Sequence, residues 1–100
     1  MSLPRVTIIC LCHNQDRFVR EAISSVLRQD YPNIQLLVVD DASTDESVSV
    51  IRECLLEHAD VNFFTHTTNV GNCRAFNEAL LHAQGDYIID LAADDVLLPD

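Results

Sequence analysis

The sequence predicts one α/β domain over residues 1–100, in which helices cover both faces of a mainly parallel sheet in a three-layer α/β/α arrangement. Two observations lead to this prediction. Short, almost continuous apolar runs alternate with segments whose apolar residues recur at helical spacing. Each strand-and-helix unit takes about 30 residues, the length of a βαβ crossover between parallel strands. With 48% hydrophobic residues, the chain can form one compact core.

Four apolar runs predict four strands. Residues 6–12 read VTIICLC, a β-branched run typical of a strand buried on both faces. A second run covers residues 34–41 and ends in two aspartates. Residues 61–65 predict a shorter third strand, and residues 87–91 a fourth, also buried.

Three amphipathic segments between these runs predict three helices. Their apolar stripes are, in chain order, Phe18, Ala22, Ile23, Val26 and Leu27; then Val48, Ile51 and Leu55; then Phe76, Ala79, Leu80 and Ala83. Ser43 and Glu46 have the spacing of a capping box at the start of the second helix. Gly85 stands where a C′ glycine would end the third.

The charge is strongly negative. The chain has sixteen acidic residues and six basic ones, all of them arginine, which gives a formal net charge of -10. Such a field repels nucleic acid and anionic membranes, so neither is expected as a direct partner. Anionic small molecules are repelled as well, unless a local group reverses the sign.

Targeting and cysteine signals predict a cytoplasmic protein. No run of about 18 apolar residues is present, which predicts no transmembrane segment, and the first residues lack the basic region and cleavage site of a secretion signal. The cysteines form no C-x-x-C pair, which favours buried thiols in a reducing compartment over zinc or disulfides. Cys10 and Cys12 are expected on one face of the first strand.

Acidic residues crowd the loops where a ligand is expected. Parallel sheets bind ligands beyond the carboxyl ends of their strands. The loops there contain Asp40 and Asp41 after the second strand, and Asp94 and Asp95 after the fourth. Gathered carboxylates are normally neutralised by proton sharing or by a hard divalent cation, which would also bridge to a diphosphate.

Three classes of protein contain small acidic α/β domains of this kind. A dinucleotide-binding oxidoreductase needs a glycine-rich first turn, and residues 11–15 contain no glycine. A phospho-receiver domain could use Asp40 and Asp41 but implies a lysine on a late strand, and the chain has no lysine. The third class is a domain that binds a sugar nucleotide.

A set of motifs in this order resembles the N-terminal half of the family 2 glycosyltransferases, which have the Rossmann-like GT-A fold. The resemblance covers roughly residues 5 to 100. It rests on residues 6–14, Tyr31-Pro32-Asn33, residues 38–45 (VVDDASTD), Asn69-Val70-Gly71, Asn77, Gly85-Asp86-Tyr87, and Asp94-Asp95 with Pro99.

The resemblance implies roles for particular residues. It places Leu11 and His13 in the loop that holds the nucleotide base, and Asp41 as the carboxylate that accepts from the pyrimidine N3–H. Asp94 aligns with a residue near the ribose. Asp95 aligns with the metal ligand of the DXD-type motif, which implies Mn²⁺ or Mg²⁺ as cofactor.

Arg74 is the candidate for the diphosphate, because it is the cation in the segment after Gly71. The chain departs from the family pattern at three positions. Ala92 replaces the first acid of Asp-x-Asp-Asp, His13 replaces a usual tyrosine, and Phe76 stands where Ala-Arg-Asn has its arginine.

The implied activity is transfer of a sugar from a nucleoside-diphosphate-sugar, expected to be a UDP-sugar, to an acceptor hydroxyl with inversion. In the family, the acceptor half and the catalytic base follow the matched segment. We therefore name no catalytic residue within residues 1–100, and expect this segment to be inactive alone. Asp86 and Asp90 are interpreted as structural.

The alternative from another class is a non-catalytic acidic α/β interaction module, whose acidic loops only cap helices. Two further expectations concern partners. An exposed edge on the fourth strand would favour a homo-oligomer. The full-length enzyme would lie in the cytoplasm, peripheral to the inner face of the membrane, with an acceptor that the sequence does not identify.

Overall fold

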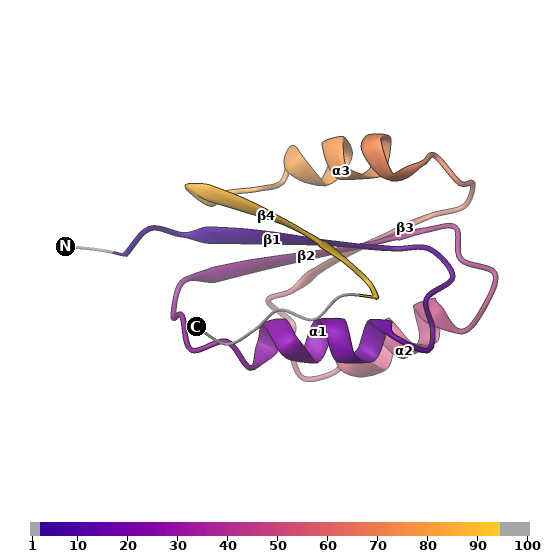
Figure 1. Ribbon diagram of the computed structural model, residues 1–100, viewed down its shortest axis with the longest axis horizontal. Coiled ribbons are helices and arrows are strands. Elements are labelled where there is room, and N and C mark those ends of the chain that lie inside the picture. Colours follow the sequence, from indigo (N-terminus) through magenta and orange to yellow (C-terminus); the bar gives the residue numbers. More distant parts are fainter. Residues whose placement is uncertain (1–2, 95–100) are drawn as a thin grey trace.

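A computed structural model describes residues 3–94. Within this range the elements follow the predicted alternation of strands and helices (Figure 1). They are β1 (Val6–Cys12), α1 (Val19–Leu27), β2 (Ile34–Asp41), α2 (Ser47–Cys54), β3 (Asn62–His66), α3 (Asn72–Leu80) and β4 (Tyr87–Ala92).

The described strands form one parallel sheet in the order β3-β2-β1-β4. Strand β1 pairs with β2 from Val6 opposite Ile34 to Cys12 opposite Asp40. Its other edge pairs with β4, so that Leu11 lies opposite Ala92. All four strands therefore end at the same edge of the sheet, as the sequence predicted.

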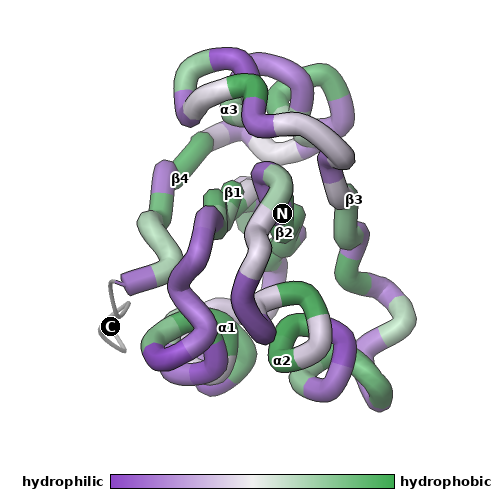
Figure 2. Tube along the Cα trace, turned by 90° about the vertical axis from the view of Figure 1, so that its right-hand side faces the viewer, coloured by the Kyte–Doolittle hydropathy of each residue, from purple (hydrophilic) through white to green (hydrophobic). Residues whose placement is uncertain are grey.

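Helices cover both faces of this sheet, which confirms the three-layer arrangement. Helices α1 and α2 lie on one face and α3 on the other (Figures 1 and 2). Because strand side chains alternate, each face has its own cluster of buried residues. Ile8, Cys10 and Val38 pack toward α1 and α2, whereas Leu37 and Val39 pack toward α3.

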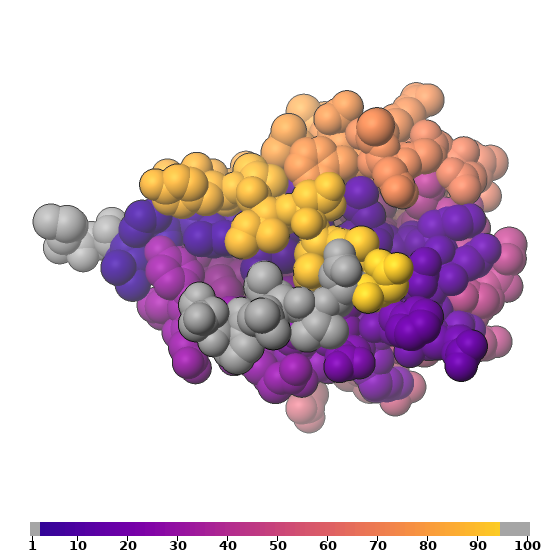
Figure 3. All heavy atoms as spheres, viewed as in Figure 1, coloured from indigo at the N-terminus to yellow at the C-terminus, as the bar shows by residue number. Residues whose placement is uncertain are grey.

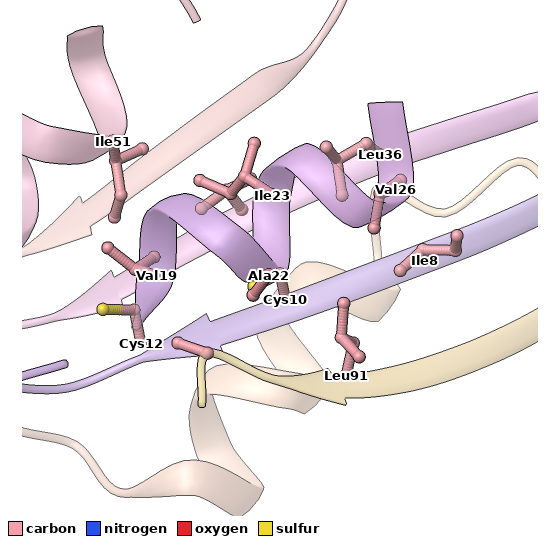
Figure 4. Packing of buried hydrophobic residues seen from close by; sticks show 12 residues of the cluster. Ile8, Cys10, Cys12, Val19, Ala22, Ile23, Val26, Leu36, Ile51 and Leu91 are labelled. Atoms are coloured by element: carbon pink, nitrogen blue, oxygen red, sulfur yellow. The ribbon is translucent and has the colours of Figure 1, made fainter. Parts of the chain in front are cut away.

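Cys10 and Cys12 lie on the same face of β1, beneath Val19 and Ala22 of α1 (Figure 4). Both are buried free thiols, as expected from the sequence. Burial is the main reason that the pKa of Cys10 rises to about 12 and that of Cys12 to about 11. They act as small hydrophobic side chains in the core.

Two residues of the predicted helical stripes are exposed. Phe18 is the N-cap of α1 with 48% exposure, and Val19, absent from the predicted stripe, is buried in its place. In α3, Leu80 is 40% exposed, and Ala75 joins Ala79 in the core. Both errors fall at helix ends, where the apolar spacing by itself does not indicate which residues the sheet covers.

The capping box predicted from Ser43 and Glu46 does not form. Glu46 is the N-cap of α2 and makes no side-chain cap hydrogen bond. The Glu46 N–H donates to Asp16 Oδ2 at 3.2 Å, and the next N–H donates to Asp45 Oδ1 at 2.9 Å. Capping groups therefore come from a neighbouring loop and from a residue outside the predicted pair.

Gly85 does not end the third helix, because α3 already ends at Leu80. Glycine is needed for close approach to β1. A Cβ at this position would lie 2.5 Å from Thr7 Oγ1 and 2.7 Å from Thr7 N. The Gly85 N–H donates to Thr7 Oγ1 at 2.9 Å, and that hydroxyl donates to Gln35 Oε1 at 2.7 Å.

Strand β4 is an edge strand of the described sheet and is mostly exposed, so the prediction of a buried fourth strand is wrong. Tyr87 is 62% exposed, and Ile88 and Ile89 are exposed as well. Figure 3 shows this strand, in yellow, along the surface that faces the viewer. The expected homo-oligomer through this edge stays a prediction. Among residues 3–94, no helix is long and apolar enough to cross a membrane.

Candidate functional site

The parallel sheet brings three of the predicted residues close to one edge. Leu11 and His13 stand at the end of β1, and Asp41 is the last residue of β2. Asp94 follows the end of β4, where the Ala93 N–H donates to the Leu11 carbonyl at 3.0 Å. Asp94 is exposed and lies in a turn. Asp95, the predicted metal ligand, lies outside the described residues.

Asp40 and Asp41 do not form a cluster of like charges, because neighbouring residues of a strand point to opposite faces. Asp40 is on the side of α1 and α2, where its carboxylate accepts from the Ser43 N–H at 2.9 Å and from the Ser43 hydroxyl. Asp41 is on the side of α3. The acidic pair read from the sequence is therefore two separate carboxylates, each with its own donors.

Asp41 is held by three donors where β2, β3 and α3 meet. The N–H groups of Val70 and Gly71 donate to its Oδ1 and Oδ2, each at 2.9 Å, and His66 Nδ1 lies 3.1 Å from Oδ1. Burial by itself raises the pKa of Asp41, but these hydrogen bonds outweigh it and the pKa lies below its usual value. Asp41 is therefore ionised at neutral pH, although only 3% of it is exposed.

His66 lies between two carboxylates. Its Nδ1 contacts Asp41 Oδ1, and its Nε2 lies 2.9 Å from Glu78 Oε2 of α3. The hydrogen bond to Asp41 is the largest cause of a raised pKa for His66; burial opposes it, and Glu78 raises the pKa further. Neither His66 nor Glu78 was singled out from the sequence, because their partners lie on other elements of the fold.

The His13 ring faces the same junction. Its Nδ1 lies 2.6 Å from the Asp41 carbonyl oxygen, which can only accept, so Nδ1 carries the hydrogen. Its Nε2 is 3.4 Å from the side-chain amide nitrogens of Asn14 and Asn69. In the neutral ring Nε2 is an acceptor, and the contact to the β2 main chain fixes the ring orientation.

The loops after β1 and β2 are joined by hydrogen bonds. The Asn14 N–H donates to Ser43 Oγ at 2.9 Å, and Asn14 Oδ1 accepts from the Thr44 N–H at 2.7 Å. The Gln15 N–H donates to Ser47 Oγ at 3.0 Å. Asn14 and Ala42, which lie in these two loops, have positive φ values of 52° and 57°. The hydrogen bonds between the two loops hold His13 and Asp41 at fixed positions relative to each other.

A hollow of about 380 Å³ lies beside this junction, between α3 and the ends of β1 and β4. It is lined by Leu11, Asn72, Cys73, Phe76, Asn77, Asp90 and Ala92. Arg74 is on α3 as well, with a 73% exposed side chain whose Nε lies 3.6 Å from Glu78 Oε1. Leu11 thus lines a cavity, whereas Arg74 is not among its lining residues and contacts Glu78, one turn further along α3.

The described residues hold no group of three or more His, Cys, Asp or Glu side chains that could bind a metal ion. The predicted metal ligand Asp95 lies outside the described residues, so the structure describes only its neighbour Asp94, which is predicted to lie near the ribose. The exposed Asp94 carboxylate is the hard oxygen donor that Mg²⁺ and Mn²⁺ prefer.

The chain belongs to glycosyl transferase family 2, because the sequence model of that family matches residues 7–100. This confirms the resemblance found in the sequence and, with the solved structures below, the GT-A fold class. The chain is 38% identical over its full length to an uncharacterized glycosyltransferase of Haemophilus influenzae, of which it covers 40%. It is 30% identical to a poly-beta-1,6-N-acetyl-D-glucosamine synthase of Staphylococcus epidermidis, over 95% of this chain and 23% of that one.

Solved glycosyltransferases have the same fold. A mannosyltransferase from Pyrobaculum calidifontis in complex with GDP-Man and Mn²⁺ matches with a TM-score of 0.86 and 33% identity, over 96% of this chain and 29% of that chain. TarS from S. aureus in complex with UDP-GlcNAc matches with a TM-score of 0.85 and 25% identity, over 94% and 28%. The chain thus spans well under half of the relatives it matches.

Proposed function

We propose that this chain binds the nucleoside diphosphate of a sugar donor, with UDP-sugar as the preferred class, for transfer of the sugar to an acceptor hydroxyl with inversion. The observation that carries the proposal is the ionised Asp41 carboxylate, anchored where three elements meet, on a residue whose main-chain carbonyl contacts the His13 ring. A fixed acceptor of this kind suits a ring N–H of a nucleobase. The nucleotide-sugar complexes of the solved relatives support the same donor class.

The base would lie between the loops that follow β1 and β2. Asp41 accepts from the ring N–H, and Leu11 supplies an apolar wall. His13 offers a ring face for stacking and an Nε2 acceptor. Uracil and guanine both carry a ring N–H beside a carbonyl, and they are the bases of UDP-GlcNAc and GDP-Man.

The diphosphate must overcome the net charge of -10. Arg74 is the cation on α3 that can meet it, and Asp94 would stand near the ribose. Asp95 would hold Mn²⁺ or Mg²⁺, and the ion supplies positive charge that stabilises the diphosphate leaving group. Carboxylate oxygens are suitable donors for either ion.

In the proposed reaction, the acceptor oxygen attacks the anomeric carbon as the bond to the β-phosphate oxygen breaks. Attack from the side opposite the leaving group inverts the configuration. A carboxylate base takes the hydroxyl proton. We assign no residue of this chain to that role.

The proposed location is the cytoplasm. Four free cysteines agree with it, because thiols stay reduced in that compartment.

Calorimetric titration of the chain with UDP, with and without Mn²⁺, tests the proposal. We expect UDP binding that Mn²⁺ strengthens, and Asp41→Asn to weaken it by about 10–100-fold through loss of a charged acceptor. Asp95→Ala should weaken binding only when Mn²⁺ is present. Asp60→Asn, an exposed acid before β3, is the matched control. If UDP does not bind, the acidic interaction module is the better description.

A further inference from the structure

The His66 ring links Asp41 to a second carboxylate that the proposed function does not use. His66 is the last residue of β3, and both of its ring nitrogens face acid oxygens. The Nδ1 distance to Asp41 Oδ1 is 3.1 Å, and the Nε2 distance to Glu78 Oε2 is 2.9 Å. Ionised carboxylates only accept hydrogen bonds. Both contacts are therefore satisfied only by the doubly protonated imidazolium.

The charged groups around His66 stabilise its doubly protonated imidazolium form. Asp41 faces it from β2 and Glu78 from α3, while Arg74 lies beyond Glu78 at 3.6 Å. His66 and His82 both line a hollow of about 240 Å³. The His82 ring stacks on the Phe64 ring, with their centroids 4.7 Å apart. The nearest charges to the His66 ring are thus two negative ones, and the pKa of His66 is raised accordingly.

The donors around Asp41 leave it one open acceptor position. A carboxylate oxygen accepts about two hydrogen bonds. Among residues 3–94, Oδ1 accepts from the Val70 N–H and from His66, whereas Oδ2 accepts only from the Gly71 N–H. As long as Asp41 is ionised, the open position on Oδ2 can accept a hydrogen but cannot donate one.

We propose that His66 and Glu78 are positioning residues that set nucleobase specificity, by keeping Asp41 ionised and oriented so that it selects a base with a ring N–H and rejects cytosine. This inference rests on the proposed function. Uracil and guanine present a ring N–H, whereas N3 of cytosine is an acceptor and would face a negative oxygen. A protonated Asp41 could donate to that N3, so loss of the imidazolium would relax the selection.

The test compares UDP and CDP binding by calorimetry in the wild type, His66→Gln and Glu78→Gln from about pH 5 to pH 9. The wild type should prefer UDP by about tenfold or more at pH 5–7. In His66→Gln, UDP should bind about fivefold more weakly, and the preference for UDP over CDP should be smaller than in the wild type, because Asp41 has lost the hydrogen bond that lowers its pKa and orients it. Glu78→Gln should move the same way by a smaller factor.

The wild type should also bind UDP more weakly as the pH rises through the raised pKa of His66. A neutral imidazole donates to only one of the two carboxylates. This alkaline loss should be absent in His66→Gln. His82→Gln, which alters the same hollow without a carboxylate partner among the described contacts, should match the wild type.

The outcomes separate the two proposals. If the wild type does not bind UDP, both fail. If it binds UDP but His66→Gln and Glu78→Gln keep its UDP preference and pH profile, the specificity role is wrong and the proposed function stands. Nitrogen NMR of the His66 ring gives a second readout. A ring with only one protonated nitrogen at pH 7 would contradict an imidazolium that donates to both Asp41 and Glu78. The NMR measurement also covers the case in which His66→Gln does not fold.

Discussion

Replacing Gly85 with alanine tests whether this glycine is required for close packing against β1. The new Cβ would lie 2.5 Å from Thr7 Oγ1, 2.7 Å from Thr7 N and 2.9 Å from the Arg5 carbonyl oxygen. Two of these atoms belong to the backbone of β1 and its approach, so a side-chain rotation cannot relieve the crowding. The segment before β4 must move away from β1.

The magnitude follows from three contributions. Alanine in place of glycine would stabilise by about 0.5 kcal/mol at an unstrained position, by restricting the unfolded chain. Crowding a packed interior costs ~1–3 kcal/mol. Moving the segment also weakens the hydrogen bonds from Gly85 to Thr7 and from the Asp86 N–H to Arg5, at about 1 kcal/mol each. We expect a net loss of about 3 kcal/mol, which lowers the unfolding temperature by roughly 10–25 °C in a domain of this size.

Thermal and urea unfolding, followed by circular dichroism, measure this loss. Gly85→Asn separates close packing from a helix-ending role, since asparagine is accepted at a C′ position but is larger than alanine. Both variants should be strongly destabilised. In a Thr7→Ala background, Gly85→Ala should cost less, because the nearest atom is gone. A loss below about 1 kcal/mol for alanine, or recovery with asparagine, would refute the packing argument.

Three further predictions concern backbone strain, thiol reactivity and pH. Ala42 has a φ of 57°, so Ala42→Gly should raise the free energy of unfolding by about 0.5–1 kcal/mol in urea titrations; an unchanged midpoint would show that the turn is unstrained. An alkylating reagent at pH 8, followed by mass spectrometry, should modify exposed Cys73 first and Cys10 last, because burial raises the Cys10 pKa to about 12; early labelling of Cys10 would contradict its burial. The pKa of His66 is raised on folding, so its contribution to stability is complete below about pH 6.5 and is lost as the pH rises through the raised pKa. The difference in the free energy of unfolding between wild type and His66→Gln should therefore become smaller over that pH range. A constant difference would count against the ion pairs of His66 with Asp41 and Glu78.

Local patterns were sufficient for the strands and for most of the helices. Apolar runs such as residues 6–12 predicted buried strands because a strand covered on both faces has no polar side. Strand β4 is also rich in apolar residues, but it is mostly exposed because it lies at the edge of the described sheet. An apolar run therefore indicates a strand, whereas its burial depends on neighbours that the run does not encode.

The candidate site divides in the same way. The position of Leu11, His13 and Asp41 at one edge follows from parallel pairing alone, since every parallel strand ends on the same side. The roles of His66 and Gly85 could not be read from the chain. Their partners lie 25 residues away in Asp41 and 78 residues away in Thr7.

The sequence by itself therefore determined the order of strands and helices along the chain, the three-layer class and the presence of polar loops at the carboxyl ends of the strands. These features depend on periodicity over a few residues. Only the tertiary structure decided on which face each buried aspartate lies, which histidine contacts Asp41 and which glycine must lack a side chain. Those properties arise from contacts between elements that are far apart along the chain, and such contacts leave no local pattern.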